Sequence, residues 1–259
     1  MTMVDAFKRR LEDQVESLKV FLTEELDATA FRKANNLIED LLHHAYTDKL
    51  TDLLRKEMMG PMFTPLLEAA QKDNFPISLV VLDHDKFKLV NDNPKGYTAY
   101  YERTPDGRRV HYTEHSAGDA LLRDSARVAK ETLRRHDRIL RYSQEITSNP
   151  DNAAAARFGG DEYVFILPYT NVSNACTLPG FLPFPETPSV LIACNRLQLG
   201  IQRVTEHTVS MGIANYPGTS ENADLETLFK QADRAMYIAK RKGGNQCVIY
   251  DSSCDNHEK

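Results

Sequence analysis

Two groups of acidic residues in the sequence have the setting of a metal site, because each adjoins a short apolar run. The run from Ile77 to Leu82 ends in Asp83, the first acid of the segment Asp-His-Asp-Lys-Phe-Lys at 83–88. The second group is Gly159-Gly160-Asp161-Glu162, in which two glycines allow a tight hairpin directly before two acids. One strand-end Asp alone is as often a turn former. If the two runs are neighbouring strands, however, several carboxylates converge, and cations must neutralise them. The pattern therefore predicts a site for Mg²⁺ and bound phosphate oxygens.

The spacing of apolar residues outlines the sheet that would hold these acids. Strand patterns occur at 77–82, 138–142, 163–167, 208–214 and 246–250. Helical spacing of three and four occurs at 121–133, 190–203 and 225–235. Polar or proline-rich stretches, predicted as loops, lie at 93–113, 143–156 and 177–188. This order of elements predicts an α+β domain in which helices cover one face of a mostly antiparallel sheet.

Two amphipathic helices are predicted ahead of this domain. The first spans Val4 to Leu22, and the second begins after Asp27, a residue type that caps helix N-termini. The apolar residues of the second helix have heptad spacing, at Phe31, Ala34, Ile38, Leu41 and Ala45. Two heptads are too few to establish a coiled coil. These helices either pack on each other or on the domain, or they form a dimerising or signal-relaying stalk.

The composition is that of a folded globular protein without a strong charge bias. Acidic residues outnumber basic ones by 37 to 32, giving a formal charge of -5, which argues against broad binding to nucleic acid or to an anionic membrane. The apolar runs are far shorter than the roughly 20 residues of a membrane-spanning helix, and the N-terminus lacks the apolar core of a secretory signal. We therefore expect a cytoplasmic location. The four cysteines lack paired metal-ligand spacing and are predicted to be free thiols.

The segment from Tyr46 to Asp251 resembles a GGDEF domain, the catalytic module of diguanylate cyclases. Gly159 to Tyr163 reads GGDEY, and further segments resemble the other signatures of the family in the same order: Asp48–Thr51, Asp83–Asp92, Gly118-Asp119, Val209–Ala214 and Ala239-Lys240. The resemblance implies a nucleotidyl-cyclase and polymerase-palm-like (ferredoxin-like) sheet flanked by helices. It divides the chain into an N-terminal helical segment at 1–46, a catalytic domain at 47–251 and a C-terminal tail at 252–259.

The activity that the resemblance implies is the condensation of two GTP molecules into cyclic di-GMP with release of two pyrophosphates. Each domain would bind one GTP, so two domains must face each other in a homodimer. Asp83 and Asp161 would ligate two Mg²⁺ ions, with Mn²⁺ as an alternative, assisted by the carbonyl of His84. Glu162 would be a further ligand or would accept the proton of the attacking 3′-hydroxyl. Such cations lower the pKa of the hydroxyl and stabilise charge on the α-phosphate and on pyrophosphate.

Four other residues would bind the nucleotide. By the same resemblance, Asn91 and Asp119 would read guanine, while Lys88 and Lys240 would contact the triphosphate. The carboxylate of Asp119 can accept hydrogen bonds from the N1-H and 2-amino groups together, and adenine offers no such donor pair. The alternatives are a turn or helix C-cap for Asn91, an N-cap for Asp119, and a complement to the helix dipole for Lys240.

The resemblance also implies a product-binding site, and the sequence departs from the family at several positions. Arg134 and Asp137 match the RxxD motif, where cyclic di-GMP would bind as an inhibitor, although a solvated helix end explains them equally well. The segment 143–156 is inserted after this motif. Gly244 stands where the family usually carries a basic residue. Tyr163 replaces the signature Phe and can occupy its space if the hydroxyl finds a partner.

Two other functions remain open. A catalytically silent GGDEF domain would bind GTP or cyclic di-GMP and signal through partners, although the full set of acids argues against it. A cyclase that makes a different nucleotide is the third reading, because the long loop after Asp92 could change the pocket.

Overall fold

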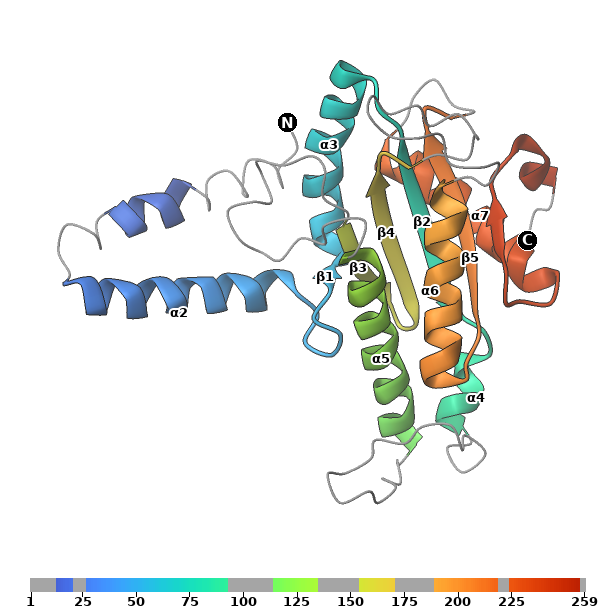
Figure 1. Ribbon diagram of the computed structural model, residues 1–259, viewed down its shortest axis with the longest axis horizontal. Helices are drawn as coiled ribbons and strands as arrows, with labels where there is room; N and C mark the ends of the chain where they lie inside the picture. Colours follow the sequence, from blue (N-terminus) through green and yellow to red (C-terminus); the bar gives the residue numbers. More distant parts are fainter. Residues whose placement is uncertain are drawn as a thin grey trace.

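The computed structural model describes residues 13–20, 27–92, 114–134, 154–170, 189–218 and 224–256. Residues 13–20 are helical, and the remaining helices and strands are α2 (Ala28–Tyr46), β1 (Leu54–Arg55), α3 (Met59–Asp73), β2 (Ile77–His84), α4 (Phe87–Asp92), α5 (Glu114–Arg134), β3 (Ala154–Gly159), β4 (Glu162–Pro168), α6 (Ser189–Thr205), β5 (Val209–Tyr216), α7 (Leu225–Arg241) and β6 (Cys247–Ile249) (Figure 1). Short 3-10 turns occupy Lys56–Met58 and Ser252–Asn256.

The strands form one six-stranded sheet in the order β1-β3-β4-β2-β5-β6. The four inner strands pair antiparallel, whereas the edge strands β1 and β6 pair parallel with their neighbours. Both edge strands are very short, with two residues in β1 and three in β6. The sheet flanked by helices confirms the predicted α+β class.

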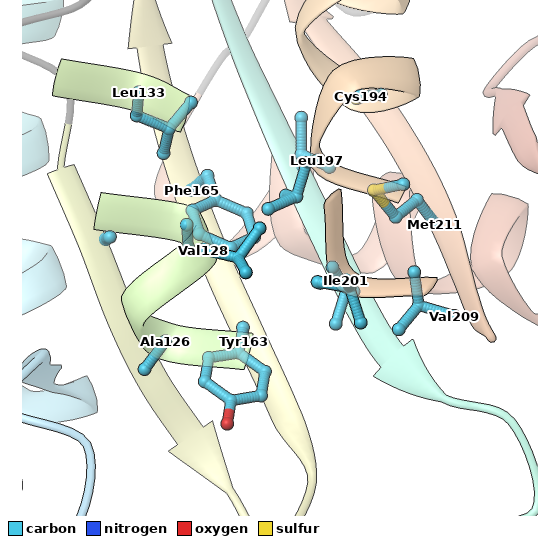
Figure 2. Packing of buried hydrophobic residues seen from close by; sticks show 14 of the residues in the cluster. Ala126, Val128, Leu133, Tyr163, Phe165, Cys194, Leu197, Ile201, Val209 and Met211 are labelled. Atoms are coloured by element: carbon cyan, nitrogen blue, oxygen red, sulfur yellow. The ribbon is translucent and has the colours of Figure 1, made fainter. Parts of the chain in front are cut away.

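Helices cover both faces of the sheet, so the prediction of one covered face was wrong. Val80 and Leu82 of β2 belong to the core under α5 and α6, while Leu79 and Val81 belong to the core under α3 and α7. Figure 2 shows the first of these cores, where Phe165 of β4 lies beside side chains of α5 and α6. Every residue of β2 is buried, because a central strand covered on both faces is apolar throughout rather than alternating.

The helix α7 lies against β5 so closely that one strand position has no room for a side chain. A Cβ atom at Gly212 would lie 1.9 Å from the carbonyl oxygen of Ala232 and 2.2 Å from the amide nitrogen of Met236. Gly212 therefore permits the close packing of the helix backbone on the strand.

The helix α2 begins where the sequence predicts. The Asp27 carboxylate accepts hydrogen bonds from the amides of Thr29 (2.8 Å) and Ala30 (2.9 Å), which confirms it as the N-cap. The helix extends away from the sheet (Figure 1), and Leu37 and Leu41 are 60% and 62% exposed. Its C-terminal end is tied to the domain through Asp52, whose carboxylate lies 2.6 Å from His43 Nε2 and forms an ion pair with Lys130 Nζ (2.5 Å) of α5.

Other sequence predictions have mixed outcomes. The helix predicted at 190–203 is confirmed by α6, and the strands predicted at 77–82, 163–167, 208–214 and 246–250 correspond to β2, β4, β5 and β6. The predicted loop 143–156 is wrong at its end, because Ala154, Ala155 and Ala156 belong to β3. These small residues pair with β4 and are buried on both faces of the sheet, which their low intrinsic strand preference does not reveal. The strand predicted at 138–142 and the loops predicted at 93–113 and 177–188 lie outside the described residues.

Candidate active site

The pairing of β4 with β2 brings the predicted acids to one end of the sheet. Asp83 is opposite Glu162 in β4 and opposite Ser210 in β5. Gly159 pairs with Glu162, so Gly160 and Asp161 form the two-residue turn of the β3–β4 hairpin. Asp83 lies near the end of β2, and Asp161 and Glu162 lie where β4 begins. The antiparallel pairing of these strands therefore places all three acids at the same end of the sheet.

The Asp83 carboxylate is the most constrained of these acids. Its side chain is 9% exposed, and its Oδ1 atom lies 2.5 Å from Nζ of Lys240 in the last turn of α7. The pKa of Asp83 is raised to about 6, mainly by burial and in part by the negative charges of Asp161 and Glu162, while Lys240 opposes the rise. The charges of the other two acids therefore act on Asp83.

The donor set has the chemistry that a hard divalent cation requires. Carboxylate oxygens are preferred ligands of Mg²⁺, and the ammonium group of Lys240 stands where positive charge is needed beside Asp83. Among the described residues, no three His, Cys, Asp or Glu side chains already converge in the geometry of a metal centre. The acids fit a cation by charge, and the pairing of β2 with β4 places them at one end of the sheet.

The His84 ring lies in the core and not in the acid cluster. It is 1% exposed and is surrounded by the rings of Phe87, Tyr163 and His207, at centroid distances of 6.0, 5.8 and 5.5 Å. Among the residues that the structure describes, neither ring nitrogen has a hydrogen-bond partner. Burial lowers the pKa of His84 to about 3, with smaller contributions from the charges of His207 and Lys240. The side chain is a neutral core residue, so any role in the site belongs to the backbone carbonyl.

The substitution His84→Leu is expected to make folding less sensitive to acid. As the pH falls below 6.5, His84 binds a proton in the unfolded chain but stays neutral in the folded protein, where its pKa is lowered. The free energy of unfolding is therefore greatest above pH 6.5 and decreases as the pH falls towards 3. The wild type should lose about 2–3 kcal/mol more than the variant between pH 7 and pH 4. At pH 7 the variant should be more stable by about 1 kcal/mol, because no polar ring atom is left unpaired. Urea unfolding at several pH values measures both differences, and parallel pH profiles would contradict the explanation.

Asp85 holds the loop that follows α7, a role the sequence analysis missed. Its carboxylate accepts hydrogen bonds from Thr208 Oγ1 (2.7 Å), Ser210 Oγ (2.6 Å) and the amide of Asn245 (2.9 Å). The signal was present in the sequence, since Asp85 follows Asp83 at strand spacing, but its partners are far away in the chain.

The departure at Gly244 has a structural reason. Gly244 has a φ of 75°, and a Cβ atom there would lie 2.8 Å from Oδ1 of Asp85. A basic residue at this position would require both a strained backbone and a shift of the Asp85 carboxylate.

The signature turn is anchored by Arg157. Its guanidinium donates to the carbonyl of Gly160 through Nε (3.1 Å) and Nη2 (2.8 Å), and Nη1 donates to Asp48 Oδ1 (3.2 Å). Asp48 in turn accepts hydrogen bonds from the amide and hydroxyl of Thr51. The Asp48–Thr51 motif and the signature motif are therefore joined by one arginine.

The hydroxyl of Tyr163 has the partner that the sequence analysis required. It donates to the carbonyl of Leu122 in α5 at 2.9 Å. Burial raises the pKa of the Tyr163 hydroxyl, which therefore remains a neutral donor. The change from the signature Phe is accommodated without an unpaired polar atom.

The elements that carry the predicted guanine readers lie side by side. Val90 of α4 packs against Ala117, Ala120 and Leu121 of α5. Asp119 is exposed and lies inside α5, which begins at Glu114, so the alternative role of an N-cap is wrong.

The remaining predicted nucleotide residues lie on α4 and α7. Asn91 is in the last turn of α4, and Lys88 is exposed on the same helix. Lys240 lies in the last turn of α7, so the alternative of a complement to the helix dipole is compatible with its ion pair to Asp83.

The predicted product-binding motif is only partly described. Arg134 is the last residue of α5, and Asp137 lies outside the described residues. The product-binding role of Arg134 and Asp137 therefore stays a prediction.

Comparisons with known proteins agree with this geometry. A profile of the family described as "Diguanylate cyclase, GGDEF domain" matches residues 45–94 and 144–246. Diguanylate cyclase DgcM of Escherichia coli (strain K12) is 29% identical over 216 residues, which is 82% of this chain and 40% of DgcM. The chain thus spans about two fifths of that relative's length.

Solved structures share the fold. The coiled coil and GGDEF domain of DgcB from Caulobacter crescentus, in complex with c-di-GMP, aligns with a TM-score of 0.57 and 20% identity over 94% of this chain and 99% of that one. Diguanylate cyclase SiaD from Pseudomonas aeruginosa, in complex with its activator SiaC, aligns with a TM-score of 0.56 and 20% identity over 94% and 76%. Within the described parts of the chain, no helix is long and apolar enough to cross a membrane.

Proposed function

Because the chain belongs to the GGDEF family of diguanylate cyclase domains, we propose that it condenses two GTP molecules into cyclic di-GMP and releases two pyrophosphates. The observation that carries this proposal is the buried Asp83 carboxylate beside Glu162 and the turn residue Asp161. Burying an acid among other acids lowers stability, and a cation site for phosphate chemistry explains why the chain retains the arrangement.

The acids have separate tasks in this proposal. Asp83 and Asp161, with the carbonyl of His84, would hold two Mg²⁺ ions, or Mn²⁺ in their place. When bound, these ions would supply the positive charge that acidifies the 3′-hydroxyl and stabilises the α-phosphate and the leaving pyrophosphate. Glu162 would complete the ligand set or accept the hydroxyl proton. Lys240, which pairs with Asp83 here, would exchange that carboxylate for a triphosphate oxygen.

Base recognition would occur where α4 meets α5. The packing of Val90 on Ala117 and Ala120 supports Asn91 and Asp119 as neighbouring guanine readers, because each is adjacent in sequence to a residue of that contact. Lys88 is exposed on α4 and would contact the triphosphate.

The reaction requires two domains, since each would supply one GTP. The exposed Leu37 and Leu41 of α2 support a homodimer in which this helix pairs with its copy. The relative DgcB was solved with a coiled coil ahead of its GGDEF domain and with c-di-GMP bound. By analogy, the product would bind Arg134 and Asp137 of this chain as an inhibitor.

The alternative is a silent domain that binds GTP or cyclic di-GMP and signals through a partner. The ion pair of Lys240 with Asp83 is the observation that favours this function, because it places a positive charge beside the buried acid without a metal. A direct assay distinguishes the two functions.

The test is incubation of the purified protein with GTP and Mg²⁺, with ATP, and with both, followed by mass identification of the products. We expect cyclic di-GMP from GTP alone, and a loss of about a hundredfold or more in the isosteric variant Asp161→Asn, because the lost charge costs several kcal/mol of transition-state stabilisation. The matched control Asp124→Asn changes a half-buried acid on α5 that pairs with Arg127 and lies outside the acid cluster, and it should keep full turnover. GTP binding without any product would favour the silent domain, and full turnover of Asp161→Asn would remove Asp161 from the mechanism.

A further inference from the structure

Two cysteines far apart in the sequence meet beside the sheet, outside the acid cluster. Cys194 in α6 is 2% exposed and belongs to the core, and the half-buried Cys247 in β6 packs against the same core. The register of the sheet explains the approach. Cys247 pairs with Met211 of β5, a member of that core that Figure 2 shows next to the helix segment of Cys194.

The side chains around Cys247 show that it faces α6. Gln198 lies one helical turn after Cys194, and its Oε1 atom accepts a hydrogen bond from the Cys247 thiol at 3.8 Å. The Nε2 atom of Gln198 donates to Asn245 Oδ1 at 2.7 Å, which holds the loop before β6 beside the helix. Cys194 and Gln198 therefore present one helix face to the start of β6.

The two thiols are chemically unequal. The interaction with Cys194 lowers the pKa of Cys247, and the interaction with Cys247, together with burial, raises the pKa of Cys194 well above its usual range. Cys247 is the more exposed of the two and is the better nucleophile, while Cys194 stays protonated beside it. A partly exposed, activated thiol next to a second thiol is the arrangement of oxidisable cysteine pairs.

We propose that Cys194 and Cys247 are a redox-active dithiol, which hydrogen peroxide converts to a reversible intrachain disulfide. The Cys247 thiolate attacks one peroxide oxygen and breaks the O–O bond, which gives a sulfenic acid and, after protonation, one water. The Cys194 sulfur then attacks the sulfenic sulfur and displaces a second water. Two thiols are oxidised by two electrons and one peroxide is reduced to two waters. A thiol reductant reverses the reaction by disulfide exchange.

This disulfide would act on the loop next to the acid cluster. Asn245, which Gln198 contacts on one side, donates its amide to Asp85 on the other. The same loop follows Lys240, the partner of Asp83. Cross-linking α6 to β6 would shift this chain of contacts, so oxidation should lower turnover; this consequence rests on the proposed cyclase function, whereas the disulfide itself does not.

The first experiment maps the disulfide without an activity assay. Purified full-length protein is treated with hydrogen peroxide, free thiols are alkylated, and tryptic peptides are analysed before and after reduction. We expect a linked pair of peptides that contain Cys194 and Cys247, which dithiothreitol separates. Cys247→Ser should abolish this product, and Cys254→Ser, which changes a thiol in the C-terminal turn, should leave it intact. Unlinked, fully alkylated Cys194 and Cys247 after oxidation of the wild type would overturn the proposal.

The second experiment measures the consequence with the same samples. Oxidation should reduce the cyclase rate of the wild type about fivefold or more, which is a typical coupling between two sites, and dithiothreitol should restore it. Cys247→Ser should be insensitive to peroxide. A disulfide that forms without a change of the cyclase rate would overturn the regulatory consequence. If the reduced protein has no cyclase activity although oxidation yields the mapped disulfide, the result counts against the cyclase function alone.

Discussion

The variant Asp83→Asn is expected to lose turnover and, without divalent cations, to be more stable than the wild type. Burial and the neighbouring acids raise the pKa of Asp83 to about 6 from an ordinary value of 3.8. A carboxyl group with a raised folded pKa costs stability whenever it is ionised. The asparagine side chain has nearly the same shape and no charge, so it removes this cost.

The sign and the pH range follow from the two pKa values. Below about pH 4 the Asp83 carboxyl is neutral in both states, so the two proteins should be similarly stable. As the pH rises through 6, the wild type loses stability and the variant does not. At pH 7 the variant should be about 1–3 kcal/mol more stable; the upper limit is the full linkage value. Lys240, whose side chain is 36% exposed, can turn to solvent once its partner is gone.

Unfolding in urea with EDTA and with Mg²⁺ measures both halves of this prediction. Mg²⁺ should stabilise the wild type in proportion to its binding and should have little effect on Asp83→Asn. The control Asp124→Asn should follow the wild type in both conditions. If Asp83→Asn is less stable than the wild type at pH 7 without cations, the Asp83 carboxylate stabilises the fold and is not a cation ligand held at a cost in stability.

Replacing Gly212 with alanine is expected to destabilise the fold by about 4 kcal/mol or more, the range of the most damaging single substitutions. The added Cβ would overlap backbone atoms of Ala232 and Met236, at 1.9 and 2.2 Å. Alanine has no rotamers, and backbone atoms within a helix cannot turn aside. The strand can accept the methyl group only if α7 moves away from β5, which opens the core between them.

The matched control is Gly60→Ala in α3, where no atom beyond the flanking residues lies within 4 Å of the added Cβ. This substitution should change the free energy of unfolding by less than about 1 kcal/mol, because the helix preference of alanine is opposed by the ring of Pro61, which follows directly. Urea denaturation compares the two variants directly. A Gly212→Ala protein within about 1 kcal/mol of the wild type would show that α7 can shift without loss of packing.

The sequence predicted the parts of the fold that apolar spacing controls. The continuous run at 77–82 and the run at 163–167 are β2 and β4, two of the four inner strands, and Asp27 begins α2 because its short carboxylate reaches two free amides. The alanine-rich β3 could not be found in this way, since its residues become strand only by pairing with β4. The placement of helices on both faces was open to inference, because a strand without polar alternation has no solvent face.

The sequence predicted those residues of the candidate site that lie in or beside short motifs. The turn at Gly160 and Asp161 was predicted from the two glycines directly before the acids, and its proximity to Asp83 follows once β4 and β2 are neighbours. The contacts that hold the site in place were not predictable, because they join distant segments. Asp85 binds Asn245, and Arg157 binds Asp48. Neither pair has a local pattern, and only the assembled sheet brings their partners within hydrogen-bonding distance.

The shortness of the two edge strands affects how copies of this chain can meet. A long, unpaired strand edge is a template on which another chain can add a strand, and many proteins aggregate in this way. Here β1 offers two residues at one edge and β6 offers three at the other. Among the described residues, the edge strands β1 and β6 therefore offer little unpaired backbone for strand addition, and we expect contacts between copies to be made by helices and loops.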